Sequence, residues 1–431
     1  MKIIRPIACL LLCLLLAGFA LAETPAQSTD FAGQLRLNMA SETLKTHATV
    51  KTFVDGDTTH FLVPESVAAS GVLRARYLAV NTPETTGKVE EYGKKAASFT
   101  KEKLMNAEDI ILESDDGKWN LDSTGGRHLV WVWYKPAGES DYRCLNLELL
   151  QNGLAIANST ANNRYGSTCM AALNQAKAEK LHLYSGQKDP DFYYGEAVEL
   201  TLRELRTNVE AYNGMKVAFN GIVTMNRDQS VYVETLDPEN GLYFGMPVYY
   251  GYNMSGAGLD ILSVGNEVRI VGTLQYYEAG GTWQVSGLTY RMMKPNDPGN
   301  IQKISDGHSA AYAPLDAETF IGQVSVETEE GSKAFPWAQL ALGTSVSIAH
   351  LTVEEAVTTL AEDSSSYGAI TLCCTSGGAD VTVRTEPMYE NGSLITQDRY
   401  LGKTISVKGV VDFYEGDYQI RVLQLDNITI E

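Results

Sequence analysis

Apolar and polar residues alternate along two stretches in the first third of the chain, "HATVKTFVDGDTTHFLV" (47–63) and "VLRARYLAV" (72–80). A period of two residues turns one side of each stretch toward a core and the other toward solvent, so we predict β-strands there. "HLVWVWY" (128–134) is predicted as a further strand. Loops rich in Gly, Asp and Ser separate them.

Helical spacing of apolar and small residues follows these strands. "KVEEYGKKAASFTKEKLMNA" (88–107) places such residues on one face, and this pattern predicts a helix. Two more helices are predicted, over "LNLELLQNG" (145–153), where Gly153 ends the helix, and over "MAALNQAKAEKLHLYS" (170–185). Interleaved strands and helices predict a compact α+β domain over residues 46–188.

The rest of the chain contains an internal repeat. "VGNEVRIVGTLQYYEAGGTWQVSGL" (264–288) matches "LGKTISVKGVVDFYEGDYQIRVLQL" (401–425) at its glycines and at a Tyr-Glu pair. Each copy predicts a strand pair closed by a Gly-containing turn, with strands and a short helix upstream. A β-barrel with a helix between its third and fourth strands is the layout of an OB-fold. We therefore predict OB-like barrels over 196–294 and 320–431, joined by a linker, and a mainly β protein overall.

The first residues, "MKIIRPIACLLLCLLLAGFALA", have a basic start, an apolar run and small residues at Ala20 and Ala22. This pattern predicts a signal peptide cut after Ala22, with residues 23–45 as a linker. A retained membrane anchor is the alternative, although the apolar run is shorter than the ~20 residues that span a bilayer. We expect the mature protein to be secreted.

Charge is distributed unevenly along the chain. The formal net charge is −19; residues 47–188 hold 16 Lys and Arg against 17 Asp and Glu, whereas residues 189–431 hold 14 against 33. Proteins bind phosphate backbones by neutralising them with Lys and Arg. Chemistry on a nucleic acid is therefore expected in the front part. For the acidic barrels, an oligosaccharide, protein or cell-wall partner is at least as compatible, and their aromatic residues "QYYEAGGTWQV" (275–285) suit either a barrel core or base stacking.

Four cysteines remain after the predicted cleavage: Cys144, Cys169, Cys373 and Cys374. Outside the cell they could pair, and a bond between Cys144 and Cys169 would close a loop within one domain. The sequence leaves that pairing open. Cys373 and Cys374 lie in an apolar run without further metal ligands nearby.

Six short motifs occur in order in the front part. They are Asp-Gly-Asp-Thr at 55–58, an Arg-containing strand leading into Thr-Pro-Glu-Thr at 82–85, Tyr-Gly at 92–93, Gly-Arg at 126–127, Asn-Gly-Leu-Ala at 152–155, and Lys-Leu-x-x-Tyr-Ser at 180–185. In this order they resemble the staphylococcal nuclease (thermonuclease) family from about Ala48 to Ser185. The resemblance implies a five-stranded OB-fold barrel with three helices that binds Ca²⁺ and cuts DNA and RNA to 3′-phosphate ends.

Carried over position by position, the resemblance implies six site residues. Asp57 and Asn81 match the calcium-binding side chains, and Thr82 matches the backbone carbonyl ligand. Glu84 matches the carboxylate that positions or deprotonates the attacking water. Arg76 and Arg127 match the arginines that hold the scissile phosphate.

Elementary chemistry supports these roles. The transition state of phosphodiester hydrolysis gathers negative charge, which a hard cation and two guanidinium groups stabilise. Calcium takes carboxylate, amide and carbonyl oxygens. Pro83 fixes the loop before Glu84, where a carboxylate could polarise water.

The sequence departs from the family pattern in three places. Asn81 stands where the family usually has an aspartate, so calcium binding should weaken. "DSTGGRHL" (122–129) is one residue longer than the family's loop and lacks its tyrosine and lysine. The tyrosines that pack on the nucleotide are absent, with Ser159 and its neighbours in their place, and Tyr165 is a candidate substitute. The sequence thus predicts a secreted, calcium-dependent nuclease; the alternative is an exported binding protein whose nuclease barrel is inactive.

Overall fold

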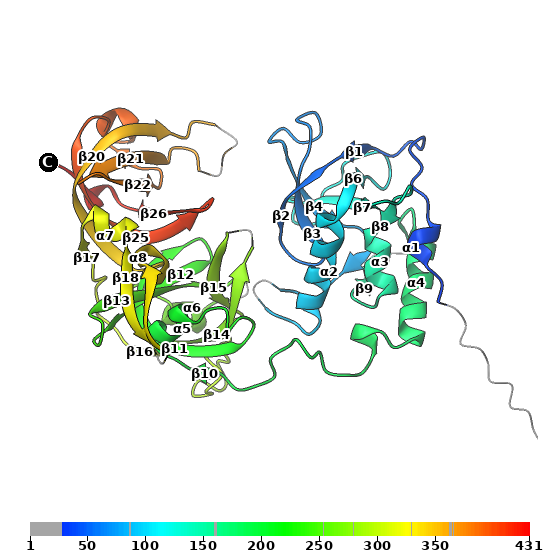
Figure 1. Ribbon diagram of the computed structural model, residues 1–431, viewed down its shortest axis with the longest axis horizontal. Coiled ribbons are helices and arrows are strands. Elements are labelled where there is room, and N and C mark those ends of the chain that lie inside the picture. The colour runs from blue at the N-terminus through cyan, green and yellow to red at the C-terminus, as the bar shows by residue number, and fades with distance from the viewer. Residues whose placement is uncertain are drawn as a thin grey trace, which may run out of the picture.

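The computed structural model describes residues 28–85, 88–158, 162–252, 254–278, 280–328, 330–361, 364 and 366–431. The predicted signal peptide and Ser159 lie outside this part. The described chain is mainly β, with three seven-stranded sheets that each enclose a hydrophobic core (Figure 1). Each sheet contains a closed five-stranded barrel with the same strand order.

The first barrel is formed by alternating strands whose apolar sides fill its core. Its order along the sheet is β1-β6-β7-β4-β3-β2, and β1 and β2 are separated only by Ala48, so the strand they form pairs at both ends of the sheet and closes the barrel. β4 and β7 are parallel, and the other pairs are antiparallel. The strands are β1 (Lys45–His47), β2 (Thr49–Phe53), β3 (Thr58–Leu62), β4 (Val72–Tyr77), β6 (Ala107–Glu113) and β7 (His128–Pro136), with β8 (Arg143–Cys144) added to β7.

Three helices accompany this barrel, as the resemblance implies. They are α2 (Gly93–Met105), α3 (Leu145–Gln151) and α4 (Gly166–Ala178). α2 starts later than its apolar spacing predicts because Tyr92 adopts a left-handed conformation, with φ of 63°. Gly153 follows α3 with φ of 66°, which a glycine accommodates without strain. A short helix, α1 (Phe31–Gln34), and a small strand pair, β5 (Val80–Asn81) with β9 (Ile156–Ala157), complete this part.

The second barrel has the predicted OB-fold order. Its five barrel strands follow the path β11-β12-β13-β15-β14, and β14 pairs back to β11. Helix α6 (Ala257–Ile261) lies between the third and fourth barrel strands, as predicted. The strands are β11 (Lys216–Arg227), β12 (Ser230–Asp237), β13 (Leu242–Tyr249), β14 (Glu267–Tyr277) and β15 (Thr282–Ser286), with β10 (Val198–Glu199) and β16 (Gln302–Ser305) at the edges and α5 (Leu202–Thr207) before them.

The third barrel repeats this order along β20-β21-β22-β26-β25, with β25 pairing back to β20. The short helix predicted upstream of the second copy of the repeat, in "NGSLITQDRY" (391–400), is a three-residue 3-10 helix, η3, preceded by the short strand β24. The elements are β20 (Ser345–Thr358), β21 (Ile370–Ser376), β22 (Ala379–Thr385), β23 (Tyr389–Glu390), β24 (Ser393–Leu394), η3 (Gln397–Arg399), β25 (Thr404–Tyr414), β26 (Asp417–Val422), η4 (Leu425–Asn427) and β27 (Ile428–Ile430).

The segment between these barrels adds further elements. β17 (Ala313–Leu315), from the stretch predicted as linker, pairs with β20. After helix α7 (Ala317–Ile321), the hairpin of β18 (Gln323–Thr328) and β19 (Gly331–Pro336) leads into α8 (Trp337–Leu340). Val326 and Leu340 belong to the core of the second barrel, so this segment links the two barrels.

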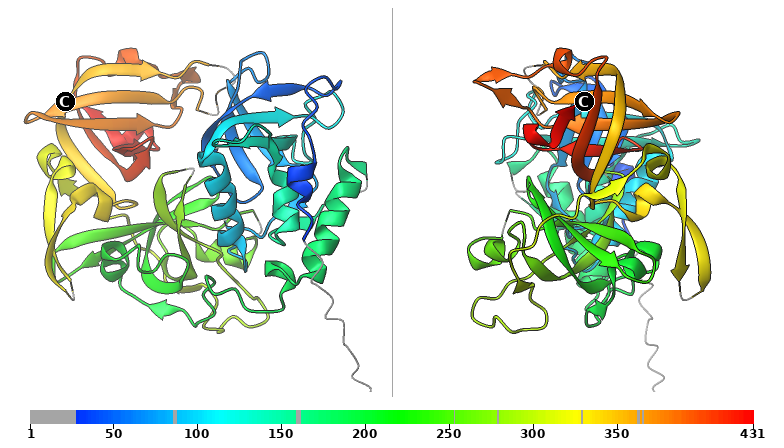
Figure 2. Two further views of the ribbon diagram at one scale, coloured as in Figure 1. Left: turned by 45° about the vertical axis from the view of Figure 1, so that its right-hand side comes forward. Right: turned by 90° about the vertical axis from the view of Figure 1, so that its left-hand side faces the viewer.

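The sequence repeat has a structural basis in matching hairpins. β14–β15 and β25–β26 are antiparallel pairs, and each carries an aromatic pair at the same place. Tyr276 faces Trp283 edge-on at 5.3 Å, and Phe413 faces Tyr418 at 4.9 Å. Figure 2 shows the two barrels stacked on one side of the molecule and the first barrel beside them.

The four cysteines of the described residues carry free thiols. Cys144 and Cys169 are both buried in the first core, Cys374 is buried in the third barrel, and Cys373 is exposed. Burial raises the pKa of Cys169 to about 12, so this thiol is protonated at neutral pH. In the described ranges, no helix combines the length and the apolar character that crossing a membrane requires.

Candidate active site

Asp57 lies at the centre of the candidate site, at the turn between β2 and β3. Its side chain is fully buried, and its Oδ2 accepts a hydrogen bond of 2.7 Å from the Thr82 backbone N–H. The turn lies close to Thr82 and to α2, since a Cβ added at Gly56 would be only 2.8 Å from Thr82 Oγ1 and 2.9 Å from the Ala96 Cβ. Glycine at the middle of Asp-Gly-Asp therefore allows the turn to hold Asp57 against the Thr82 loop.

Arg76 connects the first two predicted metal ligands. Its guanidinium, on β4, donates one hydrogen bond to Asp57 Oδ1 and another to Asn81 Oδ1. The Arg76 side chain is only 12% exposed, so the charge-assisted pair is largely shielded from solvent. Arg74, two residues earlier, is exposed, which agrees with the choice of Arg76 for the site.

Asn81 is the last residue of strand β5, and Thr82 follows it directly. Asn81 belongs to β5 and pairs with Ile156. Thr82 is 2% exposed, and its Oγ1 has no hydrogen-bond partner within the described chain. Pro83 then leads to Glu84, which is half-buried.

A cluster of three carboxylates concentrates negative charge here. Burial, followed by the charges of Asp57 and Glu84, raises the pKa of Asp55 to about 8. Burial and the charge of Asp57 also raise the pKa of Glu84, while Arg76 and Arg127 act in the opposite direction. The pKa of Glu84 therefore responds to the charges of Asp57 and of both arginines.

Arg127 comes from the loop before β7. The parallel pairing of Ala75 with His128 brings this loop beside β4 and Arg76. Arg127 Nε donates a 2.7 Å hydrogen bond to Asp122 Oδ2, and Thr124 Oγ1 donates a 2.6 Å bond to the other oxygen of Asp122. Hydrogen bonds from Thr124 and Arg127 lower the pKa of Asp122 to about 2 against the opposing effect of burial.

Asp57, Asn81 and the Thr82 carbonyl offer the kinds of oxygen ligand that a hard divalent cation accepts. Among the described residues, no group of three or more His, Cys, Asp or Glu is placed to hold a metal ion. A cation at Asp57 would therefore depend on the Asn81 amide oxygen and the Thr82 carbonyl as well, which are ligands that calcium accepts. The Arg76 guanidinium bonds to the same side-chain oxygens, so it and a cation would share them.

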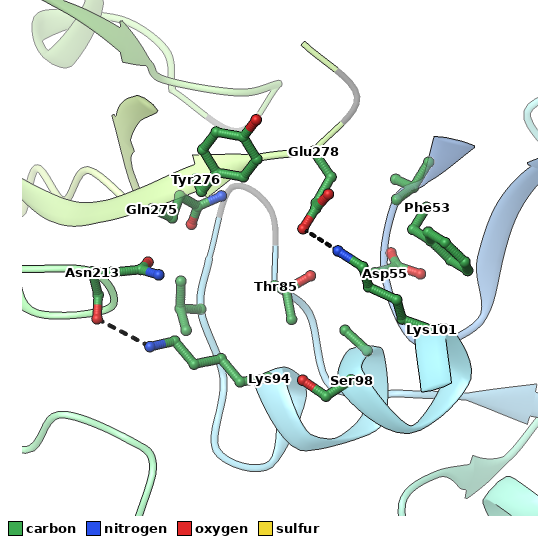
Figure 3. A pocket seen from close by; sticks show the side chains of 13 residues that line it. Phe53, Asp55, Thr85, Lys94, Ser98, Lys101, Asn213, Gln275, Tyr276 and Glu278 are labelled. Atoms are coloured by element: carbon green, nitrogen blue, oxygen red, sulfur yellow. Dashed lines mark hydrogen bonds and ion pairs between the residues drawn. The ribbon is translucent and has the colours of Figure 1, made fainter. Parts of the chain in front are cut away.

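Two hollows are lined by residues of the candidate site or its neighbours. One of about 440 Å³ is lined by Asn81, Thr82 and Pro83 together with Ile156. The other, of about 280 Å³, includes Asp55 and lies between α2 and β14 of the second barrel (Figure 3). Asp55 is the member of the carboxylate cluster that lines one of these two hollows.

The sequence patterns do not identify the roles of two residues, Asp55 and Asp122. Asp55 lies in the Asp-Gly-Asp-Thr motif (55–58), and Asp122, the partner of Arg127, lies in "DSTGGRHL" (122–129). Tyr165, the candidate substitute for the missing tyrosines, is not available for stacking. Its hydroxyl donates to the buried Glu113 at 3.0 Å, and its ring packs edge-on against Trp131 and Trp133.

A comparison with protein families identifies the domain that carries most of these residues. Residues 74–186 match the family model described as staphylococcal nuclease homologue. The matched stretch includes Arg76, Asn81, Thr82, Glu84 and Arg127, and Asp57 lies upstream of it. The part of the chain over residues 74–186 is therefore a staphylococcal nuclease homologue domain, followed by two further OB-fold barrels.

Proposed function

We propose that this protein is a calcium-dependent nuclease that is exported from the cell and hydrolyses phosphodiester bonds of DNA and RNA to 3′-phosphate ends. The observation that supports the proposal is the pair of hydrogen bonds from Arg76 to Asp57 and Asn81, with Glu84 at a position where the charges of Asp57, Arg76 and Arg127 affect its pKa. Two guanidinium groups beside a cluster of carboxylates suit a reaction in which a phosphate gains negative charge.

Each side chain has a distinct task in this proposal. Glu84 accepts a proton from water, and its raised pKa makes it a stronger base than an exposed glutamate. The water oxygen forms a bond to phosphorus, the bond to the 5′ oxygen breaks, and that oxygen takes up a proton. Arg76 and Arg127 donate hydrogen bonds to the non-bridging oxygens as their charge increases.

Asp57, Asn81 and the Thr82 carbonyl would hold Ca²⁺. When bound, the ion supplies positive charge next to the phosphate and lowers the pKa of a neighbouring water. The fixed hydrogen bond from Thr82 N–H to Asp57 keeps the ligand loop and the turn together.

Export and the partners of the two acidic barrels are part of the proposal. Export is supported by the first 22 residues and would be tested by N-terminal sequencing of protein recovered from the culture medium of the source cells. The net charge of −19 over residues 189–431 favours a glycan, cell-wall or protein partner for the distal surfaces of the barrels over a nucleic acid.

The decisive experiment incubates the purified mature protein with DNA and RNA, in calcium and in chelator. Calcium-dependent cleavage with 3′-phosphate ends is expected. If no cleavage occurs, the alternative of a non-catalytic binding protein gains support, and calorimetry with Ca²⁺ would show whether the site still binds the ion.

A further inference from the structure

The second barrel contacts the nuclease barrel directly beside the candidate site. Lys101 on α2 forms a 2.8 Å ion pair with Glu278, at the end of the β14 hairpin strand. Lys94 on the same helix donates a 3.1 Å hydrogen bond to the Asn213 carbonyl. These two contacts bracket the hollow of about 280 Å³ between α2 and β14 (Figure 3).

The hollow opens next to the carboxylate cluster. Asp55 lines it and also accepts a 3.1 Å hydrogen bond from the Asp57 backbone N–H. Thr85, adjacent to Glu84, lies between the two walls in Figure 3. A strand whose phosphate is held by Arg76 and Arg127 would bring a neighbouring nucleotide toward this opening.

A buried polar group faces this space from the second barrel. Gln275 is 5% exposed and lines the hollow, and its Oε1 accepts a 2.9 Å hydrogen bond from Ser286. Its Nε2 has no hydrogen-bond partner in the described chain. A buried donor without a partner is costly, so a ligand that supplies an acceptor would gain from it.

The same strand offers an aromatic surface. Tyr276 is 41% exposed and lines the hollow, and its contact with Trp283 holds the ring in place. Bases stack on such exposed aromatic side chains. Phe53 lines the opposite wall, on the nuclease barrel.

The charge and the size of the hollow favour a nucleobase over a phosphate group as its occupant. The lining contains two lysines, Lys94 and Lys101, and two acids, Asp55 and Glu278, and each lysine already has a partner. A volume of about 280 Å³ lies at the small end of ligand pockets, which suits one ring system and not a base pair.

We propose that this hollow is a nucleobase subsite of the nuclease, built jointly by the first two barrels, in which Gln275 donates to an acceptor on the base edge and Tyr276 contacts its face. The subsite rests on the proposed nuclease function. It assigns β14 of the second barrel a direct part in substrate binding, although this strand lies outside the family match at residues 74–186.

The test uses the full mature chain and two single-stranded probes of equal length, an oligothymidylate and its abasic counterpart. Binding is measured by competition against a fluorescent oligonucleotide in chelator, and cleavage of oligothymidylate is measured in calcium. Tyr276→Ala should weaken oligothymidylate binding about tenfold, within the range of one base stack, and leave abasic binding unchanged. Gln275→Glu keeps the size of the side chain and removes the Nε2 donor, and it should also weaken oligothymidylate binding.

Two controls separate the subsite from other effects. Tyr276→Phe keeps the ring and should retain most of the affinity, and Tyr252→Ala changes an 81% exposed tyrosine of the same barrel that does not line the hollow. Equal binding of oligothymidylate by Tyr276→Ala and the unaltered protein would overturn the subsite, as would an equal loss for both probes. Absence of cleavage by the unaltered protein, with base-dependent binding preserved, would overturn the nuclease function and leave the subsite standing.

Discussion

Arg76 and Asp57 are hydrogen-bonded to each other across 19 residues of sequence, with the guanidinium donating to Asp57 Oδ1. Asp57 directly precedes β3 and Arg76 lies on β4, and the antiparallel pairing of Thr58 with Arg76 brings them together. This relationship joins a predicted phosphate-binding residue to a predicted metal ligand. Arg76 therefore bonds to oxygen atoms of two predicted calcium ligands, and the following predictions test how this arrangement works.

Glu84→Gln should lower kcat by about 10²- to 10⁴-fold, the contribution typical of a general base. The amide keeps the size of the side chain but cannot accept the proton, and the unfolding temperature should change little. Cleavage kinetics and thermal unfolding measure both effects. Glu65→Gln, at an exposed loop position, is the matched control. A full rate in Glu84→Gln would assign water activation to another group.

Asn81→Asp should tighten calcium binding by about tenfold, equivalent to ~1.4 kcal/mol, because calcium affinity increases with ligand charge. Calorimetric titration with Ca²⁺ measures the change. Gln34→Glu adds the same charge at an exposed position away from the site and should leave the affinity unchanged. Weaker binding by Asn81→Asp would show that residue 81 is not a ligand and serves only Arg76.

Asp122→Asn should reduce kcat/KM on the order of tenfold, ~1.4 kcal/mol, because the replacement weakens the 2.7 Å hydrogen bond that orients Arg127. Asp122 is a positioning residue, so the effect should disappear in an Arg127→Ala background. A double-mutant cycle of cleavage rates measures this coupling. Asp116→Asn, in the neighbouring exposed loop, is the control; additive effects of Asp122→Asn and Arg127→Ala would contradict the positioning role.

Asp30→Asn should lower the unfolding temperature at pH 6 but not at pH 2. Hydrogen bonds from Arg143 at 2.9 Å, the largest cause, lower the pKa of Asp30 from its ordinary 3.8 to about 2. A lowered pKa means that the stabilisation is present above about pH 4 and is lost as the pH falls toward 2. Thermal unfolding across this range measures the difference.

The control for this pH dependence is Asp141→Asn. Asp141 and its partner Arg36 are 3.7 Å apart, and both side chains are 58% exposed, so little change is expected at either pH. An Asp30→Asn difference that stays constant from pH 6 to pH 2 would show that the ion pair does not cause it.

Much of the architecture follows from local sequence patterns. The period-two stretches form β2, β3 and β4, the apolar stretch 128–134 lies in β7, and the repeat of 264–288 in 401–425 forms equivalent hairpins. Such patterns succeed because strand burial and hairpin turns depend on residues close in sequence. The short helix predicted in "NGSLITQDRY" (391–400) is reduced to the 3-10 helix η3, because part of this segment pairs as strand β24.

The residue types of the candidate site can be recognised from the chain alone: carboxylates and an amide for a hard cation, arginines for a phosphate, and a carboxylate after Pro83 for water. Which of these residues interact depends on the folded barrels. There Arg76 bonds to both Asp57 and Asn81, Arg127 bonds to Asp122, Tyr165 packs against Trp131 and Trp133, and Gln275 and Tyr276 line one hollow with Asp55. Hydrogen bonds, burial and electrostatic effects depend on distances in space, and barrel closure brings together residues that are far apart in the chain.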